Sequence, residues 1–278
     1  PFSLSEKIVD QIRAITKNLA LAFGIRGLLN IQYAVRDEHV FVIELNPRAS
    51  RTVPFSSKAT GVSLAKYASR IMAGEKISEL RAQGLLPDEN RTVDYYAVKE
   101  AVMPWSRFPG ADSILGPEMK STGEVMGIAR TFPAAYAKTR EAVENKLPEQ
   151  GSVFISVCDR DKRAIAPVAM ALENLGYGIY TTGGTAKTLR AAGIDCTTVN
   201  RISDGHPNVV DLMRDKTVSF IINTPHGHEA HSDGTKMRAE AVSQGITCVT
   251  AMSAATALIQ ALAAARKSEP ETFALQDL

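Results

Sequence analysis

Two stretches near the start of the chain alternate between apolar and polar side chains, as half-buried β-strands do. They cover residues 27–35 and 41–46, and the short polar link between them predicts an antiparallel hairpin. Side chains along a strand point to opposite faces in turn. We therefore expect the second strand to have one face packed on a core and one polar face. The expected core set is Phe41, Ile43 and Leu45, and the opposite set is Val42, Glu44 and Asn46.

The polar face predicts a metal site if the hairpin has the right register. Glu44 and Asn46 place two oxygen donors on this face, and Gln32 of the first strand adds a third if it pairs with Glu44. That pairing requires a three-residue loop at 37–39 or a β-bulge. A four-residue loop would instead pair Gln32 with Ile43 and turn it toward the core. Carboxylate and amide oxygens are suitable ligands for Mg²⁺ or Mn²⁺.

Two arginines, Arg48 and Arg51, follow the second strand directly. A guanidinium group matches the geometry of phosphate oxygens. Metal donors beside phosphate-binding cations indicate a nucleoside-triphosphate site. On spacing alone, the alternative is a half-buried edge strand with a polar outer face.

The rest of the first half shows helical periodicity interrupted by irregular segments. The first helix should begin with a capping box of Ser3 and Glu6 and stop at Gly24. Surface turns are expected at 80–92 and a long loop at 105–117. The expected helices are 3–23, 60–74 and 131–147, and the expected strand is 95–104. The break in pattern at 148–151 predicts two domains, 1–148 and 149–278.

Strands alternate with helices throughout the second half, which is typical of a doubly wound, mostly parallel α/β sheet. The expected strands are 152–157, 176–180, 196–199, 218–223 and 247–249. The expected helices are 164–175, 186–192, 237–244 and 254–267. The chain as a whole is therefore assigned to the α/β class.

The run Thr181-Thr-Gly-Gly-Thr185 lies between a predicted strand and a predicted helix. A helix start offers free N–H groups and the positive end of the helix dipole, which suit a phosphate. Arg201 and Asn223 also fall just beyond strand ends, at the edge where such sheets bind ligands. The alternative is a glycine turn capped by threonine. The histidines of 226–231 suit a solvated loop better than a metal site.

Composition excludes several classes of protein. Apolar residues make up 45% of the chain, charged residues 22%, and the net charge is +2, so no strong field favours nucleic acid or a membrane surface. No apolar run reaches the roughly 18 residues that a membrane helix needs. Three scattered cysteines favour a reducing cytoplasm. The chain opens without methionine or signal peptide, so we expect a piece of a longer polypeptide.

Several segments closely resemble the second ATP-grasp unit of the carbamoyl phosphate synthetase large subunit. They are Asn30-Ile-Gln-Tyr, Glu44-Leu-Asn-Pro-Arg-Ala-Ser-Arg with its continuation to Gly61, Val98-Lys-Glu, Phe108-Pro-Gly and 115–127. The resemblance implies that Gln32, Glu44 and Asn46 bind divalent metal, Mg²⁺ or Mn²⁺, with Gln32 and Glu44 also contacting ATP. It implies that Arg48 and Arg51 approach the phosphates.

For the whole chain, the resemblance implies a C-terminal ATP-grasp subdomain of α+β type followed by a doubly wound methylglyoxal-synthase-like domain. The implied activity is the ATP-dependent phosphorylation of carbamate, formed from bicarbonate, to carbamoyl phosphate for arginine and pyrimidine biosynthesis. A glutamine amidotransferase small subunit and an oligomeric enzyme are implied as well. The other ATP-grasp subdomain would lie upstream, so we expect the isolated chain to be inactive.

The second domain resembles the allosteric module of that enzyme. The resemblance implies UMP or IMP binding near Thr182, Gly184, Thr185, Arg201 and Asn223, and ornithine binding that involves Glu100 and Thr250. Two departures leave the effector open, because a family lysine aligns with Asn174 and a second threonine with Pro225. The alternatives are a stand-alone effector-binding module and a methylglyoxal synthase, in which Asp204 and Asp211 would be candidate bases.

Overall fold

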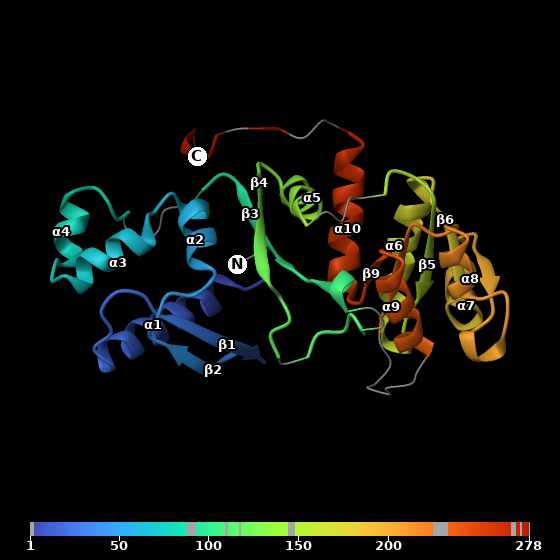
Figure 1. Cartoon of the computed structure of the whole chain (residues 1–278), viewed down its shortest axis with the longest axis horizontal. Helices are drawn as coiled ribbons and strands as arrows, with labels where there is room; N and C mark the ends of the chain where they lie inside the picture. Colours follow the sequence, from blue (N-terminus) through green and yellow to red (C-terminus); the bar gives the residue numbers. More distant parts are fainter. Residues whose placement is uncertain are drawn as a thin grey trace. The chain divides into compact units, whose positions relative to one another are not determined.

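The structure is a computed structural model that describes residues 3–87, 93–108, 111–116, 118–143, 148–224, 233–267, 271–272 and 274–277. Contacts divide the chain into two compact units, one of Pro1–Asp94 with Thr272–Leu278 and one of Tyr95–Glu271 (Figure 1). In the part of the chain that is described, no helix combines the length and the apolar character needed to cross a membrane.

The first unit is built on the predicted hairpin, β1 (Asn30–Arg36) and β2 (His39–Asn46), which pair antiparallel. The helix α1 (Glu6–Ala22) precedes the hairpin, and the Thr16 and Tyr33 hydroxyls hydrogen bond at 2.7 Å between the two. Three short α-helices follow the hairpin in the described part of this unit. They are α2 (Val53–Thr60), α3 (Leu64–Met72) and α4 (Ile77–Ala82).

Several local predictions for this unit were wrong. Ser5, not Ser3, precedes the first residue of α1, and its side chain makes no capping bond, so the expected capping box does not form. The pattern after the second strand predicts a turn and a basic loop, but Val53–Thr60 form α2, whose first turn accommodates a proline. Gly61, at φ +70°, ends α2 rather than helping to begin the next helix. The expected surface turns at 80–92 begin within α4, where Leu80 is fully buried.

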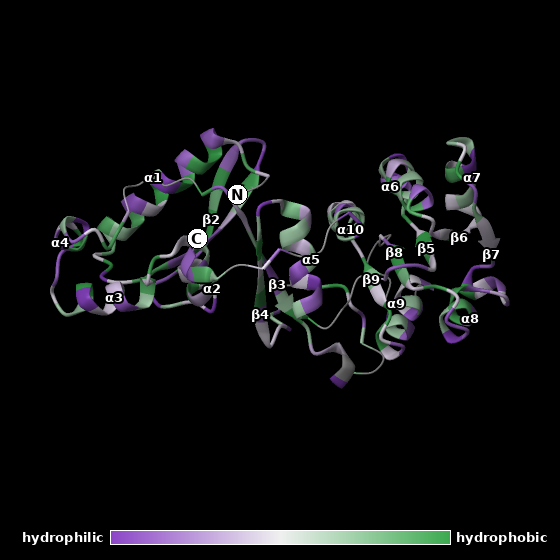
Figure 2. Ribbon diagram, turned by 90° about the horizontal axis from the view of Figure 1, so that it is seen from above, coloured by the Kyte–Doolittle hydropathy of each residue, from purple (hydrophilic) through white to green (hydrophobic). Residues whose placement is uncertain are grey.

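The second unit contains a five-stranded parallel sheet in the order β7-β6-β5-β8-β9. Its strands are β5 (Ser152–Ser156), β6 (Gly178–Thr182), β7 (Thr197–Val199), β8 (Phe220–Asn223) and β9 (Thr247–Val249). All five were expected, and the apolar β5 and β8 are seen between helices in Figure 2. The prediction of a doubly wound parallel sheet is confirmed.

Helices cover both faces of this sheet. One apolar cluster joins the sheet to α6 (Lys162–Asn174), α7 (Gly183–Ala191) and α10 (Met252–Ala265). A second cluster joins the opposite face to α8 (Val209–Arg214), which the sequence did not reveal, and α9 (Asp233–Ser243). The alternation of Val153 and Ile155 with Phe154 along β5 supplies one side chain after another to the two clusters.

A second hairpin, β3 (Tyr96–Val102) and β4 (Gly123–Ala129), belongs to this unit together with α5 (Phe132–Ala142). The strand β4 was not expected. Tyr136 of α5 packs against the first apolar cluster, the one that includes α10. This contact links α5 and its hairpin to the parallel sheet. The contact division thus falls at 94/95, while the proposed domain boundary at 148/149 stays a prediction.

The backbones of β4 and α5 approach each other closely at Gly127. A Cβ atom on Gly127 would lie 2.0 Å from the Ala135 carbonyl oxygen. We expect Gly127→Ala to lower the free energy of unfolding by about 1–3 kcal/mol, because strand and helix must separate to admit the methyl group. Urea denaturation followed by circular dichroism measures this.

Gly123→Ala is the matched control, because a Cβ atom on Gly123 of the same strand meets nothing within 4 Å. Equal destabilisation by the two substitutions would contradict the packing argument.

Candidate functional site

The hairpin of the first unit has the register on which the metal-site prediction depended. Gln32 faces Glu44, and Asn30 faces Asn46. The strands are joined by a two-residue turn, Asp37 and Glu38, in which both residues have positive φ. The register therefore comes from a β-bulge between Gln32 and Tyr33 and not from a three-residue loop.

The bulge overturns the expected face assignment for part of β2. Because Ile43 is the extra residue, Val42 pairs with Tyr33 and Phe41 pairs with Ala34. Val42 thus lies on the face of Tyr33, and Phe41 lies on the face of Gln32 and Glu44. Phe41 is 54% exposed and Ile43 is 63% exposed. The prediction that Phe41 and Ile43 face a core was wrong.

The three candidate metal-binding side chains lie on one face. Gln32 is directly opposite Glu44, and the Asn46 side-chain amide donates to Glu44 Oε1 at 2.9 Å. No group of three or more histidine, cysteine, aspartate or glutamate side chains with the placement of a metal site occurs in the described ranges. The donor set here has one carboxylate and two amides, whose hard oxygen atoms fit a Mg²⁺ or Mn²⁺ ion.

The two candidate phosphate-binding arginines follow this face immediately. The Arg48 backbone N–H donates to the Asn46 carbonyl at 2.9 Å, so the chain turns back just after the strand. The Arg48 side chain donates from Nη1 to the Ala49 carbonyl at 3.1 Å, and both Arg48 and Arg51 are exposed. Arg51 lies just before α2. Two cations thus lie within a few residues of the oxygen donors.

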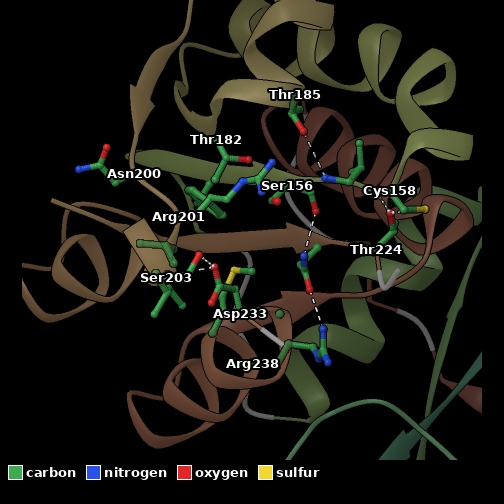
Figure 3. Close-up of a pocket in the computed structure, with 18 of the residues that line it drawn as sticks. Ser156, Cys158, Thr182, Thr185, Asn200, Arg201, Ser203, Thr224, Asp233 and Arg238 are labelled. Carbon is green, nitrogen blue, oxygen red and sulfur yellow. Dashed lines mark hydrogen bonds between the residues drawn. The ribbon is translucent and has the colours of Figure 1, made fainter. Parts of the chain in front are cut away.

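The second unit contains a cavity of about 570 Å³ at the carboxyl ends of its strands (Figure 3). The strand order reverses at β5, which has β6 on one side and β8 on the other. Open α/β sheets bind ligands at such a switch point. The effector-site residues predicted to meet here do so, since all five line the cavity: Thr182, Gly184, Thr185, Arg201 and Asn223.

The glycine–threonine run forms the start of α7. Thr182 is the N-cap residue, the helix begins at Gly183, and Gly184 belongs to its first turn. Thr185 is buried, and its hydroxyl accepts a hydrogen bond from the Val157 N–H at 3.4 Å, which links α7 to the end of β5. The free N–H groups and positive dipole end of α7 therefore adjoin the cavity.

Two cations adjoin the same helix start. Arg201 follows β7 and extends into the cavity in Figure 3. Lys162, the first residue of α6, was missed from the sequence, although it lines the cavity and its Nζ lies 3.7 Å from a Cβ position on Gly184. Asn174 is the last residue of α6, about 18 Å along the helix from Lys162, and does not line the cavity.

Asn223 is fixed by hydrogen bonds on both sides of its amide. Its Nδ2 donates to the Ser156 carbonyl at 2.9 Å, and its Oδ1 accepts from Arg238 Nη1 at 2.8 Å. Arg238 of α9 also forms an ion pair with Asp112. Burial raises the pKa of Asp112, but hydrogen bonds from Arg238 and the Ile114 N–H outweigh it and hold the pKa below its usual value. Neither Arg238 nor Asp112 was identified from the sequence.

Carboxylates also border the cavity. Asp159 pairs with Lys162 at 2.5 Å, and Asp233 accepts hydrogen bonds from the Ser203 N–H at 3.1 Å and hydroxyl at 2.9 Å. The cavity therefore combines cations and a helix start with acceptors suited to hydroxyl or amino groups. That combination suits a phosphorylated, hydrogen-bonding molecule better than a bare anion.

The remaining candidate residues lie elsewhere. Glu100 of β3 pairs with Arg140 of α5, and Thr250 follows β9; neither lines the cavity. Asp211 accepts from the His206 ring at 2.7 Å and from the Asn208 N–H at 2.8 Å, and these hydrogen bonds lower its pKa. Asp211 and Asp204 do not line the cavity, so their placement does not favour a role as bases. Pro225 and the histidines of 226–231 lie outside the described residues.

Comparison with known proteins matches each half to a family. Residues 2–80 match the family described as the carbamoyl-phosphate synthase L chain ATP binding domain, and residues 164–250 match the MGS-like domain. A solved structure of methylglyoxal synthase from Elizabethkingia anophelis aligns at 17% identity and a TM-score of 0.33, over 41% of this chain and 79% of that one.

Longer relatives match almost the whole chain. The carbamoyl phosphate synthase large chain of Pseudomonas syringae pv. tomato is 46% identical over 281 residues, covering 100% of this chain and 25% of that protein. That of Acidobacterium capsulatum is 45% identical, over 98% of this chain and 25% of that protein. The C-terminal section from Aquifex aeolicus is 43% identical, over 98% of this chain and 52% of that protein.

This chain therefore spans a quarter to a half of the length of these relatives. The two family matches occur in the same order in one chain, and the identity to the large chains extends through the region between them. The chain belongs to the carbamoyl phosphate synthase large-chain family and carries an ATP-binding-domain segment followed by an MGS-like domain.

Proposed function

We propose that this chain provides part of the ATP site for phosphorylation of carbamate in a carbamoyl phosphate synthase. The observation that carries the proposal is the register of the first hairpin, which brings Gln32, Glu44 and Asn46 to one face. The family match of residues 2–80 to an ATP-binding domain supports the same assignment.

In the proposed reaction, Glu44, Asn46 and Gln32 would hold Mg²⁺ or Mn²⁺, and Gln32 and Glu44 would also contact ATP. The ion, when bound, offsets charge on the ATP phosphates. Arg48 and Arg51 orient the phosphate chain and balance the negative charge that develops on the transferred phosphoryl group. Phosphoryl transfer depends mainly on positioning and electrostatics, which these side chains can supply without covalent chemistry.

The proposal extends to the complete enzyme. Its substrates are ATP and bicarbonate, its carbamate is made with ammonia from a glutamine amidotransferase small subunit, and its product feeds arginine and pyrimidine biosynthesis. We propose a cytoplasmic, oligomeric enzyme with no nucleic-acid or membrane partner. The support is the likeness to carbamoyl phosphate synthase large chains along nearly the whole of this chain.

The cavity of the second unit is proposed to bind a phosphorylated effector, such as UMP or IMP. Its phosphate would lie at the start of α7, between the Thr182 and Thr185 hydroxyls and the cations Lys162 and Arg201. Asn223 adds an amide from β8. The Asp233 carboxylate is available to accept a hydrogen bond from the sugar or base.

Ornithine is proposed as a second effector at Glu100 and Thr250. Glu100 Oε1 pairs with Arg140, whereas the buried Oε2 has no hydrogen-bond partner among the described residues. A buried carboxylate oxygen without a donor suits an ammonium group.

A stand-alone effector-binding module remains the alternative if the ATP-site residues prove inert. A methylglyoxal synthase is disfavoured because Asp204 and Asp211 do not line the cavity.

Removal of the single carboxylate of the metal face tests the ATP site. In the complete large chain, we expect Glu44→Ala to reduce carbamoyl phosphate formation by about a hundredfold or more, because phosphoryl transfer relies on metal-bound charge balance. The measurement is turnover with ATP, bicarbonate and ammonia. Asp10→Ala, at an exposed position of α1, is the control and should leave turnover unchanged. Unchanged turnover in Glu44→Ala would refute the assignment.

The 278-residue chain alone should not make carbamoyl phosphate. We expect this because the proposed donors and arginines form one side of an ATP site, and the family's remaining ATP-grasp residues are contributed by another segment. The measurement is product formation from ATP and carbamate, with the complete large chain as positive control. Detectable product from this chain alone would show that the proposed division of the site is wrong.

Substitution of the cations in the cavity tests effector binding. We expect Arg201→Gln or Lys162→Gln to weaken binding of UMP or IMP about tenfold to a hundredfold, the loss of one charged hydrogen bond. Calorimetry with UMP, IMP, ornithine and inorganic phosphate measures this. Lys187→Gln on the exposed side of α7 is the matched control. Equal binding by all variants would place the ligand elsewhere.

A further inference from the structure

We propose that Asp112 is a positioning residue for the effector cavity: it holds Arg238, which in turn fixes the Asn223 amide. This inference rests on the proposed role of the cavity as an effector site. It adds a link between the cavity and the connection of β3 to β4, which is 126 residues from Arg238 in the chain.

Arg238 is held by side chains on several sides. Its side chain is 4% exposed, Nε donates to Asp112 Oδ1 at 2.6 Å, and Nη2 donates to Asp112 Oδ2 at 2.7 Å. Nη2 also donates to the Thr235 hydroxyl at 3.3 Å. A two-point bond of this kind fixes the plane of the guanidinium group. The third nitrogen, Nη1, is thereby aimed at Asn223.

Only one orientation of the Asn223 amide satisfies its two neighbours. The Ser156 carbonyl can only accept a hydrogen bond, and the guanidinium of Arg238 can only donate one. Nδ2 must therefore face Ser156 and Oδ1 must face Arg238, as the chain of bonds in Figure 3 shows. Among the described residues no acceptor takes the second hydrogen of Nδ2, which leaves it as a donor for an anion in the cavity that Asn223 lines.

Asp112 connects this arrangement to a different part of the unit. Its Oδ1 also accepts from the Ile114 N–H at 3.0 Å, so the same carboxylate orders the β3–β4 connection locally. The Asp112 side chain is 29% exposed, far more than that of Arg238. If the Asp112 side chain moved away from Arg238, the buried guanidinium of Arg238 would lose its counter-ion, which is unfavourable. Arg238 would then reorient, and Asn223 would lose its fixed orientation.

The coupling must act in both directions. If docking of Asp112 prepares Asn223 for an anion, then an anion bound at Asn223 must favour docking of Asp112. An ion pair with a purely structural role would stabilise the fold, and ligand binding would leave the docking of Asp112 on Arg238 unchanged. Ligand-dependent protection of the β3–β4 connection therefore separates the two explanations.

The test uses the 278-residue chain with IMP and UMP as probes. Hydrogen exchange of residues 111–116 and calorimetry are measured for wild type, Asp112→Asn and the matched control Glu118→Gln, which removes a carboxylate from the same connection. We expect a ligand to slow exchange several-fold in wild type and control. In Asp112→Asn, we expect binding about tenfold weaker and no ligand-dependent protection.

A second variant covers the case in which Asp112→Asn does not fold. Arg238→Lys keeps the positive charge, but a lysine cannot bind Asp112 at two points and Asn223 at the same time. This variant should also lose the ligand-dependent slowing of exchange at residues 111–116. Ligand binding by wild type without slower exchange at 111–116 would overturn the proposal, as would undiminished binding by Asp112→Asn. Failure of wild type to bind either nucleotide would instead refute the proposed effector site and remove the basis of this inference.

Discussion

The common face of Gln32 and Glu44 in the first unit depends on a single extra residue in β2. Side chains alternate with a period of two, so insertion of Ile43 reverses the faces of the residues before it. Without the bulge, Glu44 and Gln32 could not share a face while the strands remained joined by a two-residue turn. The metal-site hypothesis therefore depends on backbone geometry as much as on the identity of the donors.

A different constraint organises the second unit. In a parallel sheet, every strand delivers its last residues to the same edge, so residues far apart in the sequence meet without direct contacts between their helices. Ser156, Thr182, Arg201 and Asn223 come from the ends of four strands and line one cavity. The two clusters of apolar side chains hold these ends in place from opposite faces.

The sequence was informative where a local pattern decides the outcome. Alternation predicted the hairpin, and the positions after strands predicted the lining of the cavity. The faces of Phe41 and Val42 were wrong because alternation cannot reveal a bulge. Lys162, Asp112 and Arg238 were missed because their roles arise from contacts between distant segments. The short helices α2, α4 and α8 were missed because six to eight residues carry little periodicity.

The start of α7 has a consequence for how this cavity can change over evolution. A mutation that replaces a side chain at the start of α7 leaves the backbone N–H groups and the helix dipole in place. Neither of them titrates near neutral pH. If the cavity binds a phosphorylated effector as proposed, a preference for phosphate over an uncharged nucleoside would have a backbone origin that persists while Lys162, Arg201 and their neighbours diverge. Effector identity could then change among phosphorylated metabolites, with the sugar and base contacts changing first.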